Sequence, residues 1–274
     1  MITGKDRIAN SFKTLGEKGE KGLITYVTAG FPSADHTLEI TRELALHSDL
    51  IEIGIPFSDP VADGPVIQNS SFRALEGGIK LSDIFNLAEK IRGGTDLPLL
   101  FMTYYNPVMR YGIENFVRNS HDSGVDGLIV PDLPLEEDHI LRECAVKYGL
   151  SLVPLVAPTS TDQRIGKISA RTDSFIYCVS VTGVTGSEKE ISTDLKTFSG
   201  RVRKNTSHPL AVGFGISGPE VARRSAAYFD AVVVGSAIVR AVDGGGGLPG
   251  MVKRVGSLAG GIKDALRNGC DADE

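Results

Sequence analysis

Short apolar runs recur along the chain, each four to seven residues long, rich in β-branched side chains and bounded by Gly, Pro or Asp. Runs of this length and composition predict β-strands. They begin near Leu23, Leu50, Pro98, Gly127, Ser151, Ser174, Leu210 and Ala231. Seven of the eight are too apolar for a strand that has one face in water. We therefore predict parallel strands that are covered on both faces.

Amphipathic segments lie between these runs and predict helices. In three of the segments, apolar residues recur at spacings of three and four, over 35–47, 82–92 and 134–149. Capping patterns predict two further helix starts. These patterns are Ser160 with Gln163, and Ser217 with Pro219 and Glu220. Strands and helices therefore alternate along the chain.

Eight alternating units in about 250 residues match a closed (β/α)8 TIM barrel better than an open doubly wound sheet. We expect a single barrel domain over residues 1–274, with a short polar tail from about residue 268. The Gly244 to Gly247 tract lies too near the end of the chain to bound a second domain.

The composition is that of an ordinary soluble globule, with 41% hydrophobic residues, 23% charged residues and a mean hydropathy near zero. A net charge of −5 and a pI near 5.6 provide no excess of cations to follow a phosphodiester backbone. Broad nucleic-acid binding is therefore disfavoured. We find no apolar segment of the length that a secretion signal or a membrane span requires.

Cysteine and histidine positions argue against metal and disulfide sites. Cys144, Cys178 and Cys270 are odd in number and never spaced as CxxC, which disfavours a disulfide framework and a structural zinc site. They are interpreted as small core or tail residues in a reduced, cytoplasmic protein. The five histidines lie far apart without HxH or HExxH spacing, so we expect no metal.

Two connections between strands are longer than the others, and both begin with polar, Gly-rich sequence. They start with residues 55–68 and 180–190. In a barrel, the loops that follow the carboxyl ends of strands build the active site. The sequence therefore predicts functional loops, although long surface insertions are the alternative interpretation.

Glu52 is a carboxyl group inside an otherwise apolar run, where an ionised form would lose most of its hydration. Desolvation raises a carboxyl pKa towards neutrality, which suits a group that both donates and accepts a proton. The alternatives are an exposed strand end or a buried ion pair. Asp63 follows in a turn-rich segment, and two such carboxyls could divide the roles of proton carrier and charge stabiliser.

Two Gly-containing segments follow the last two runs, at 213–217 and 234–239. Barrels often bind phosphate at this position through backbone amides and a helix N-terminus. The first segment has no Lys or Arg, so we expect amides and the Ser236 hydroxyl to hold the phosphate. The alternative is that the glycines only permit tight turns. The Gly-rich segment 181–187 could close over a ligand.

Three tyrosines in or beside the apolar runs are expected to be core aromatic residues more often than catalytic groups. This expectation covers Tyr104, Tyr105 and Tyr177.

Six motifs together closely resemble the tryptophan synthase alpha chain family. They lie at 25–32 (TYVTAGFP), 51–68 (IEIGIPFSDPVADGPVIQ), 127–137 (GLIVPDLPLEE), 183–186 (GVTG), 212–217 (VGFGIS) and 232–239 (VVVGSAIV). The match runs in order from about residue 5 to about residue 265. A Glu followed by IPFSDPxADGP is highly specific to this family, whereas GFGIS and VGSA occur in several phosphate-binding barrels.

The resemblance implies retro-aldol cleavage of indole-3-glycerol phosphate to indole and glyceraldehyde 3-phosphate, a lyase step of tryptophan biosynthesis. Glu52 matches the family's proton-shuttling Glu, and Asp63 matches the Asp that faces the indole nitrogen. Tyr177 matches a supporting Tyr near the glycerol portion. The implied phosphate-binding residues are Gly186, Gly213, Phe214, Gly215, Gly235 and Ser236. Residues 7–15 match the extra N-terminal helix that closes the barrel bottom in this family.

The resemblance also implies a partner. The family acts with a beta chain that binds pyridoxal phosphate, in an alpha2-beta2 tetramer, and the alpha chain itself needs no cofactor. Pro56, Asp59 and Pro60 match the loop that faces this partner, which could couple its state to the carboxyl groups.

One departure concerns the closing loop, where many family members have Ser-Arg at the positions of Ser180 and Val181. Val181 cannot supply the ordering contacts of that Arg. Three other functions stay open from the sequence: a lyase that needs no beta chain, a catalytically silent activating subunit, and an isomerase or epimerase with the same phosphate loops. An isomerase or epimerase function would not explain the IPFSDPVADGP motif.

Overall fold

The computed structural model of the chain describes residues 3–179, 188–213 and 215–268. Within these ranges nine parallel strands form one sheet, in the order β5-β4-β3-β2-β1-β9-β8-β7-β6. The strands are β1 (Gly22–Thr28), β2 (Leu50–Gly54), β3 (Leu99–Met102), β4 (Gly127–Ile129), β5 (Ser151–Val153), β6 (Leu155–Val156), β7 (Ile176–Val179), β8 (Leu210–Gly213) and β9 (Ala231–Val234).

The two edges of this sheet are halves of one predicted strand. Strand β5 pairs with β4, and β6 pairs with β7, while Pro154 separates the halves. Proline has no N–H for a strand ladder, so the pairing is interrupted there. The Pro154 carbonyl still accepts a 3.0 Å hydrogen bond from the Tyr177 amide. The strands therefore close into a barrel with eight strand positions, and the predicted fold class is confirmed.

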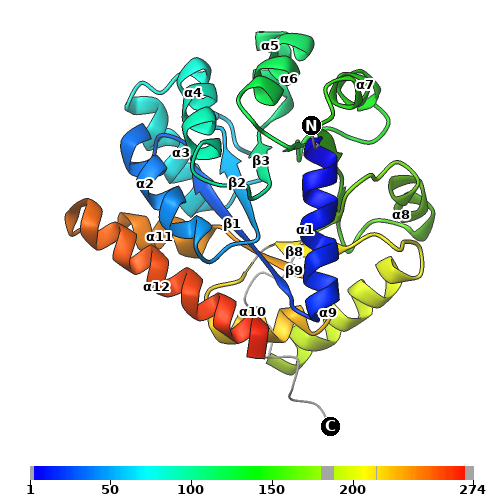
Figure 1. The fold of residues 1–274 in the computed structure, drawn as a ribbon. Coiled ribbons are helices and arrows are strands. Elements are labelled where there is room, and N and C mark those ends of the chain that lie inside the picture. The colour runs from blue at the N-terminus through cyan, green and yellow to red at the C-terminus, as the bar shows by residue number, and fades with distance from the viewer. Residues whose placement is uncertain (1–2, 180–187, 214, 269–274) are drawn as a thin grey trace.

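Helices surround the strands, as Figure 1 shows. They are α1 (Gly4–Lys18), α2 (Ala34–Ala45), α3 (Pro65–Glu76), α4 (Leu81–Arg92), α5 (Tyr105–Tyr111), α6 (Ile113–Asp122), α7 (His139–Lys147), α8 (Asp162–Ser169), α9 (Glu188–Arg203), α10 (Pro219–Ala226), α11 (Ser236–Asp243) and α12 (Gly247–Asn268). No helix within the described ranges is long and apolar enough to cross a membrane. The predicted polar tail lies mostly beyond these ranges.

Three predicted helix starts need correction. The segment 134–149 is helical only from His139, because its first residues form turns. Helix α8 is capped by Thr161, whose side chain accepts from the Arg164 amide, and not by Ser160. Helix α10 begins at Pro219, but its N-cap is a glycine, Gly218, without a side-chain hydrogen bond.

Side chains from one face of each strand fill the barrel interior. Ile24 of β1 and Leu50 of β2 lie in register near the amino ends of their strands. Helix α1 closes this end with its apolar face, formed by Ile8, Phe12 and Leu15, and the Phe12 ring lies 5.1 Å from that of Phe175. The predicted N-terminal helix is therefore present, and its apolar face covers the amino end of the barrel interior.

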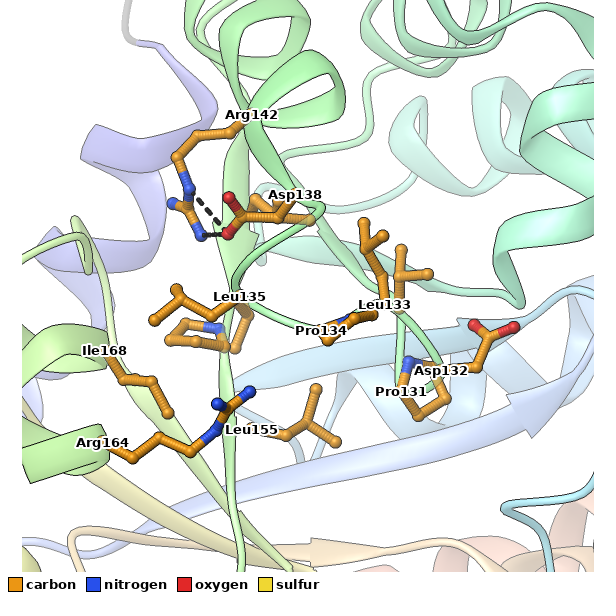
Figure 2. A pocket seen from close by; sticks show the side chains of 14 residues that line it. Pro131, Asp132, Leu133, Pro134, Leu135, Asp138, Arg142, Leu155, Arg164 and Ile168 are labelled. Atoms are coloured by element: carbon orange, nitrogen blue, oxygen red, sulfur yellow. Dashed lines mark hydrogen bonds and ion pairs between the residues drawn. The ribbon is translucent and has the colours of Figure 1, made fainter. Parts of the chain in front are cut away.

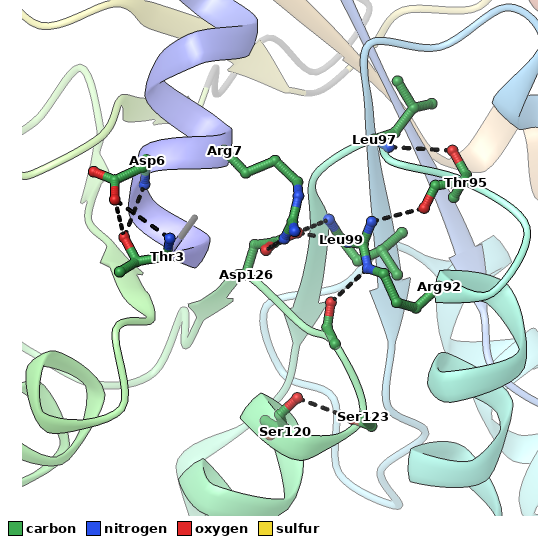
Figure 3. Close-up of polar contacts among 11 residues, drawn as sticks. Thr3, Asp6, Arg7, Arg92, Thr95, Leu97, Leu99, Ser120, Ser123 and Asp126 are labelled. Atoms are coloured by element: carbon green, nitrogen blue, oxygen red, sulfur yellow. Dashed lines mark hydrogen bonds and ion pairs between the residues drawn. The ribbon is translucent and has the colours of Figure 1, made fainter. Parts of the chain in front are cut away.

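Ion pairs hold α1 against this closed end. Asp126, which is 1% exposed, binds Arg7 of α1 and Arg92 of α4, and accepts a 2.8 Å hydrogen bond from the Leu99 amide (Figure 3). A buried carboxylate with several donors is favourable only when its partners are complete. This cluster therefore serves the closed end of the barrel.

Candidate active site

Glu52 lies in the interior of the barrel, in register with Tyr26 of β1 and Leu100 of β3. Its side chain is 1% exposed, and neither carboxyl oxygen has a hydrogen-bond partner among the described residues. Burial, reinforced by the charge of Asp63, raises the pKa of Glu52 to about 8. Within the described part of the chain, the group is neither an exposed strand end nor half of an ion pair.

Asp63 lies at the end of the loop that connects β2 to α3. Its side chain is half-buried, and Oδ2 accepts a 2.9 Å hydrogen bond from the Tyr104 hydroxyl. Burial raises the pKa of Asp63, while the hydrogen bond from Tyr104 lowers it. The helix that follows is capped by Gly64, so the Asp63 carboxylate is not a helix cap and is available for other chemistry.

Two buried tyrosines lie close to these carboxyl groups. Tyr177 of β7 and Tyr26 of β1 have raised pKa values because they are buried and lie in the field of Glu52 and Asp63. Both phenols therefore stay protonated at neutral pH and can donate hydrogen bonds. Tyr177 belongs to the barrel core, as expected of an aromatic residue in an apolar run, and also lies near the carboxyl groups.

Tyr26 ends a chain of buried hydroxyl groups that was not predicted from the sequence. Thr28 Oγ1 lies 3.3 Å from the Tyr26 hydroxyl and 2.7 Å from Ser70 Oγ, which also lies 2.8 Å from the Ile67 carbonyl oxygen. The chain connects the barrel interior with helix α3. The period-two spacing of Tyr26 and Thr28 along an apolar run was a signal that could have placed both on one face.

The expected phosphate site lies at the carboxyl ends of two neighbouring strands. Gly213 ends β8, and Gly215 follows with a φ of 76°, a conformation that favours glycine. Gly235 is the N-cap of α11 without a side-chain cap, and Ser236 is the first residue of that helix. Amides of a first helical turn lack intrahelical partners and can bind an anion.

Several predicted residues of the same region lie outside the described residues. They are Gly186, Phe214 and the closing segment that contains Val181.

The residues expected to face a partner differ in exposure. Asp59 is exposed and accepts a 2.5 Å hydrogen bond from the Ser58 hydroxyl, and Pro60 is partly exposed. Val61, which follows, is 82% exposed. Pro56 is buried, so its contribution to a partner surface can only be through the shape of the loop.

A separate pocket of about 420 Å³ lies beside the loop that follows β4 (Figure 2). Its two arginines already have acidic partners. Arg142 Nη2 lies 2.6 Å from Asp138, and Arg164 Nη1 lies 2.7 Å from Glu136. Neither Glu52 nor Asp63 lines this pocket, so we do not assign it as the active site.

The sequence model and the sequence relatives that match this chain carry one family name. The sequence model described as "Tryptophan synthase alpha chain" matches residues 12–267. The alpha chain of Thermoanaerobacter sp. (strain X514) is 47% identical over 262 residues, which are 95% of this chain and 100% of the relative. That of Methanosarcina acetivorans is 48% identical over 248 residues, which are 89% of each chain.

Solved structures of similar sequence share the fold of this chain. A structure from Aquifex aeolicus VF5 has a TM-score of 0.87 at 42% identity, and covers 96% of this chain and 99% of its own. Tryptophan synthase from M. tuberculosis, in an open form, has a TM-score of 0.86 at 31% identity, with 95% and 98% covered. The chain belongs to the tryptophan synthase alpha chain family.

Proposed function

We propose that this chain cleaves indole-3-glycerol phosphate to indole and glyceraldehyde 3-phosphate. The observation that carries the proposal is the pair of carboxyl groups in the barrel. Glu52 is buried without a hydrogen-bond partner among the described residues, and it lies in the field of Asp63. A carboxyl group in these surroundings is suited to proton transfer near neutral pH.

The reaction requires a proton at C3 of the indole ring before the carbon–carbon bond can break. Glu52, whose pKa is raised to about 8, holds a proton at neutral pH and can donate it to C3. The resulting carboxylate then accepts the proton of the glycerol hydroxyl. As the carbonyl forms, the C–C bond breaks and its electron pair restores the C2–C3 double bond of the ring, while the C=N π pair returns to the positive nitrogen, which releases indole and the aldehyde.

Asp63 has the complementary role in this proposal. Protonation at C3 places a positive charge on the indole nitrogen, and a carboxylate beside that nitrogen stabilises the charge. The Tyr104 hydroxyl favours the ionised form of Asp63. Tyr177 supports the glycerol portion as a buried donor.

In the proposal, phosphate is held by residues that end β8 or follow β8 and β9 in the sequence, together with Gly186 of the segment 181–187. The residues concerned are Gly186, Gly213, Phe214, Gly215, Gly235 and Ser236. The support for this placement is the uncapped first turn of α11, which presents backbone amides at the carboxyl end of a barrel strand.

The partner in this proposal is a tryptophan synthase beta chain, in an alpha2-beta2 tetramer. Asp59 and Pro60, on the loop shaped by Pro56, would face it. Pyridoxal phosphate belongs to the beta chain, so this chain uses no cofactor of its own. We also assign the reaction to the cytoplasm, an assignment that rests on the odd number of cysteines and the lack of CxxC spacing in the sequence.

Indole release from indole-3-glycerol phosphate by the purified chain, with and without a beta chain, tests the proposal. Weak activity that rises with the beta chain and is lost in Glu52→Gln is the expected result. High activity that a beta chain leaves unchanged would indicate a self-sufficient lyase. Unchanged tryptophan formation by Glu52→Gln would support a silent activating subunit and contradict the proposal.

A further inference from the structure

Tyr104 contacts both ends of the loop that carries Asp63. It is 3% exposed and lies two residues after the end of β3, as the N-cap of α5. Its ring centroid lies 5.3 Å from that of Phe57, near the start of the loop. Its hydroxyl accepts a 3.0 Å hydrogen bond from the Ala62 amide and donates a 2.9 Å bond to Asp63, at the loop's end. One side chain therefore fixes residues six positions apart.

The Tyr104 hydroxyl uses its single proton for Asp63 and accepts a second hydrogen bond from Ala62. A phenol has one proton, and here that proton points to Asp63 Oδ2, while the Ala62 amide occupies an acceptor position on the oxygen. Within the described chain, the Asp63 carboxylate has no other hydrogen-bond donor. Hydrogen bonds to an ionised acceptor are strong and directional. The hydroxyl therefore sets the orientation of this carboxylate.

Tyr104 is itself held on two sides. The Thr103 amide donates a 3.0 Å hydrogen bond to the Ile129 carbonyl of β4, which extends the strand ladder up to Tyr104. The Tyr105 amide donates a 2.9 Å bond to the Asp132 carboxylate, on the loop after β4. Because both neighbours in sequence are fixed, the tyrosine can act as a rigid support for the loop.

We infer that Tyr104 is a positioning residue for the cleavage reaction: its ring and hydroxyl hold the two ends of the β2–α3 loop and orient the Asp63 carboxylate. The inference rests on the proposed function, because it assigns Asp63 a role in that reaction. Tyr104 acts through Asp63 and Ala62, so it is not a catalytic residue. This role differs from the core-aromatic role that the sequence predicted for it.

The pH dependence of activity can report whether the Tyr104 hydroxyl acts on Asp63, because the other ionisable groups near Asp63 are known. Glu52 on β2, Tyr26 on β1, Tyr177 on β7 and Tyr104 all lie in its field. Of the described groups, Tyr104 is the one that lowers the pKa of Asp63. Loss of the hydroxyl would therefore raise this pKa further, so that ionised Asp63 would be reached only at higher pH.

The test compares Tyr104→Phe with the wild type in complex with the beta chain. This variant keeps the ring beside Phe57 and removes only the hydroxyl. We expect kcat for indole release to fall by about tenfold to a hundredfold, the loss typical of one hydrogen bond to a charged group, with KM little changed. The acidic limb of the kcat–pH profile should move to higher pH. Tyr105→Phe, at the next position, is the matched control and should leave both unchanged.

A second readout is independent of activity. Ala62 loses its acceptor in Tyr104→Phe, so amide hydrogen exchange across residues 58–64 should become at least about fivefold faster than in the wild type. Exchange of the β-strands should not change. This measurement follows the loop directly in the folded chain.

Two results would overturn the inference. The first is a Tyr104→Phe variant with wild-type kcat and wild-type exchange. The second is a variant with reduced kcat whose acidic limb stays in place, which would indicate a merely structural contribution. A wild-type chain that releases no indole would instead refute the proposed function, and the exchange measurement would still decide whether the hydroxyl holds the loop.

Discussion

Glu52 lies within β2 and Asp63 near the end of the loop that follows this strand, yet among the described residues only Asp63 has a hydrogen-bond donor. The Tyr104 hydroxyl lies 2.9 Å from Asp63, whereas both Glu52 oxygens are buried and unpartnered within the described residues. Burial therefore raises the pKa of both carboxyl groups. The hydrogen bond from Tyr104 lowers the pKa of Asp63, whereas no described group lowers that of Glu52. The two carboxyl groups are thereby separated into a proton carrier and a charge stabiliser.

The first prediction concerns Glu52→Gln. The amide has the shape of the carboxyl group but cannot transfer a proton, so kcat for indole release should fall by about 10² to 10⁴, the usual contribution of a general acid or base. Steady-state kinetics with the beta chain measure this loss. Glu89→Gln, an exposed site on α4, is the matched control and should retain full activity. A Glu52→Gln variant within threefold of wild type would contradict the assignment.

The second prediction concerns the pH dependence of stability. The folded chain keeps the Glu52 proton up to about pH 8, whereas the unfolded chain releases it near the ordinary pKa of 4.5. The folded state thus binds more protons between these values, and its unfolding free energy falls as pH rises through this window. The slope from this one group approaches about 1.4 kcal/mol for each pH unit.

Glu52→Gln removes that slope. Urea unfolding of wild type and variant at several pH values should show the variant gaining relative stability from pH 5 to pH 8, with a constant difference above it. A difference that does not depend on pH would mean that the Glu52 pKa is not raised in the folded chain.

The third prediction concerns Asp63→Asn. The amide oxygen can still accept the hydrogen bond from Tyr104, so the fold and the loop should be preserved. The variant cannot balance a positive charge on the indole nitrogen, and kcat should fall by about 10² or more. Inhibition by inorganic phosphate should be the same as in wild type. A parallel loss of thermal stability and phosphate binding would instead identify Asp63 as a structural residue.

Much of the fold could be predicted because strands and helices leave local patterns. The apolar run around Glu52 made both a strand and an unusual carboxyl group visible in the sequence. The break in the fifth strand position also had a signal, since Pro154 stands in the middle of SLVPLV and cannot donate in a ladder. The start of α7 could not be placed, because periodicity continued through residues that form turns.

The contact between Tyr104 and Asp63 could not be predicted in the same way. The two residues are 41 positions apart and meet only because β2 and β3 are neighbours in the barrel. Which hydroxyl reaches which carboxylate depends on side-chain direction at the ends of two loops. Tyr26 was missed for a related reason, because its strand gave no sign that Ser70 on α3 would continue its hydroxyl chain.

The fourth prediction concerns the proposed phosphate site. Ser236 begins α11, where backbone amides supply most of the proposed contacts and the hydroxyl adds one more. Ser236→Ala should therefore raise KM for indole-3-glycerol phosphate by about threefold to tenfold, the value of one hydrogen bond, and leave kcat nearly unchanged. Ser257→Ala on the exposed face of α12 is the matched control.

Competition by inorganic phosphate separates this role from a general disturbance of the barrel. Its inhibition constant should rise in Ser236→Ala by the same factor as KM, because both anions would use the same group. An unchanged inhibition constant together with a reduced kcat would mean that the phosphate is bound elsewhere and that Ser236 contributes only to the first turn of its helix.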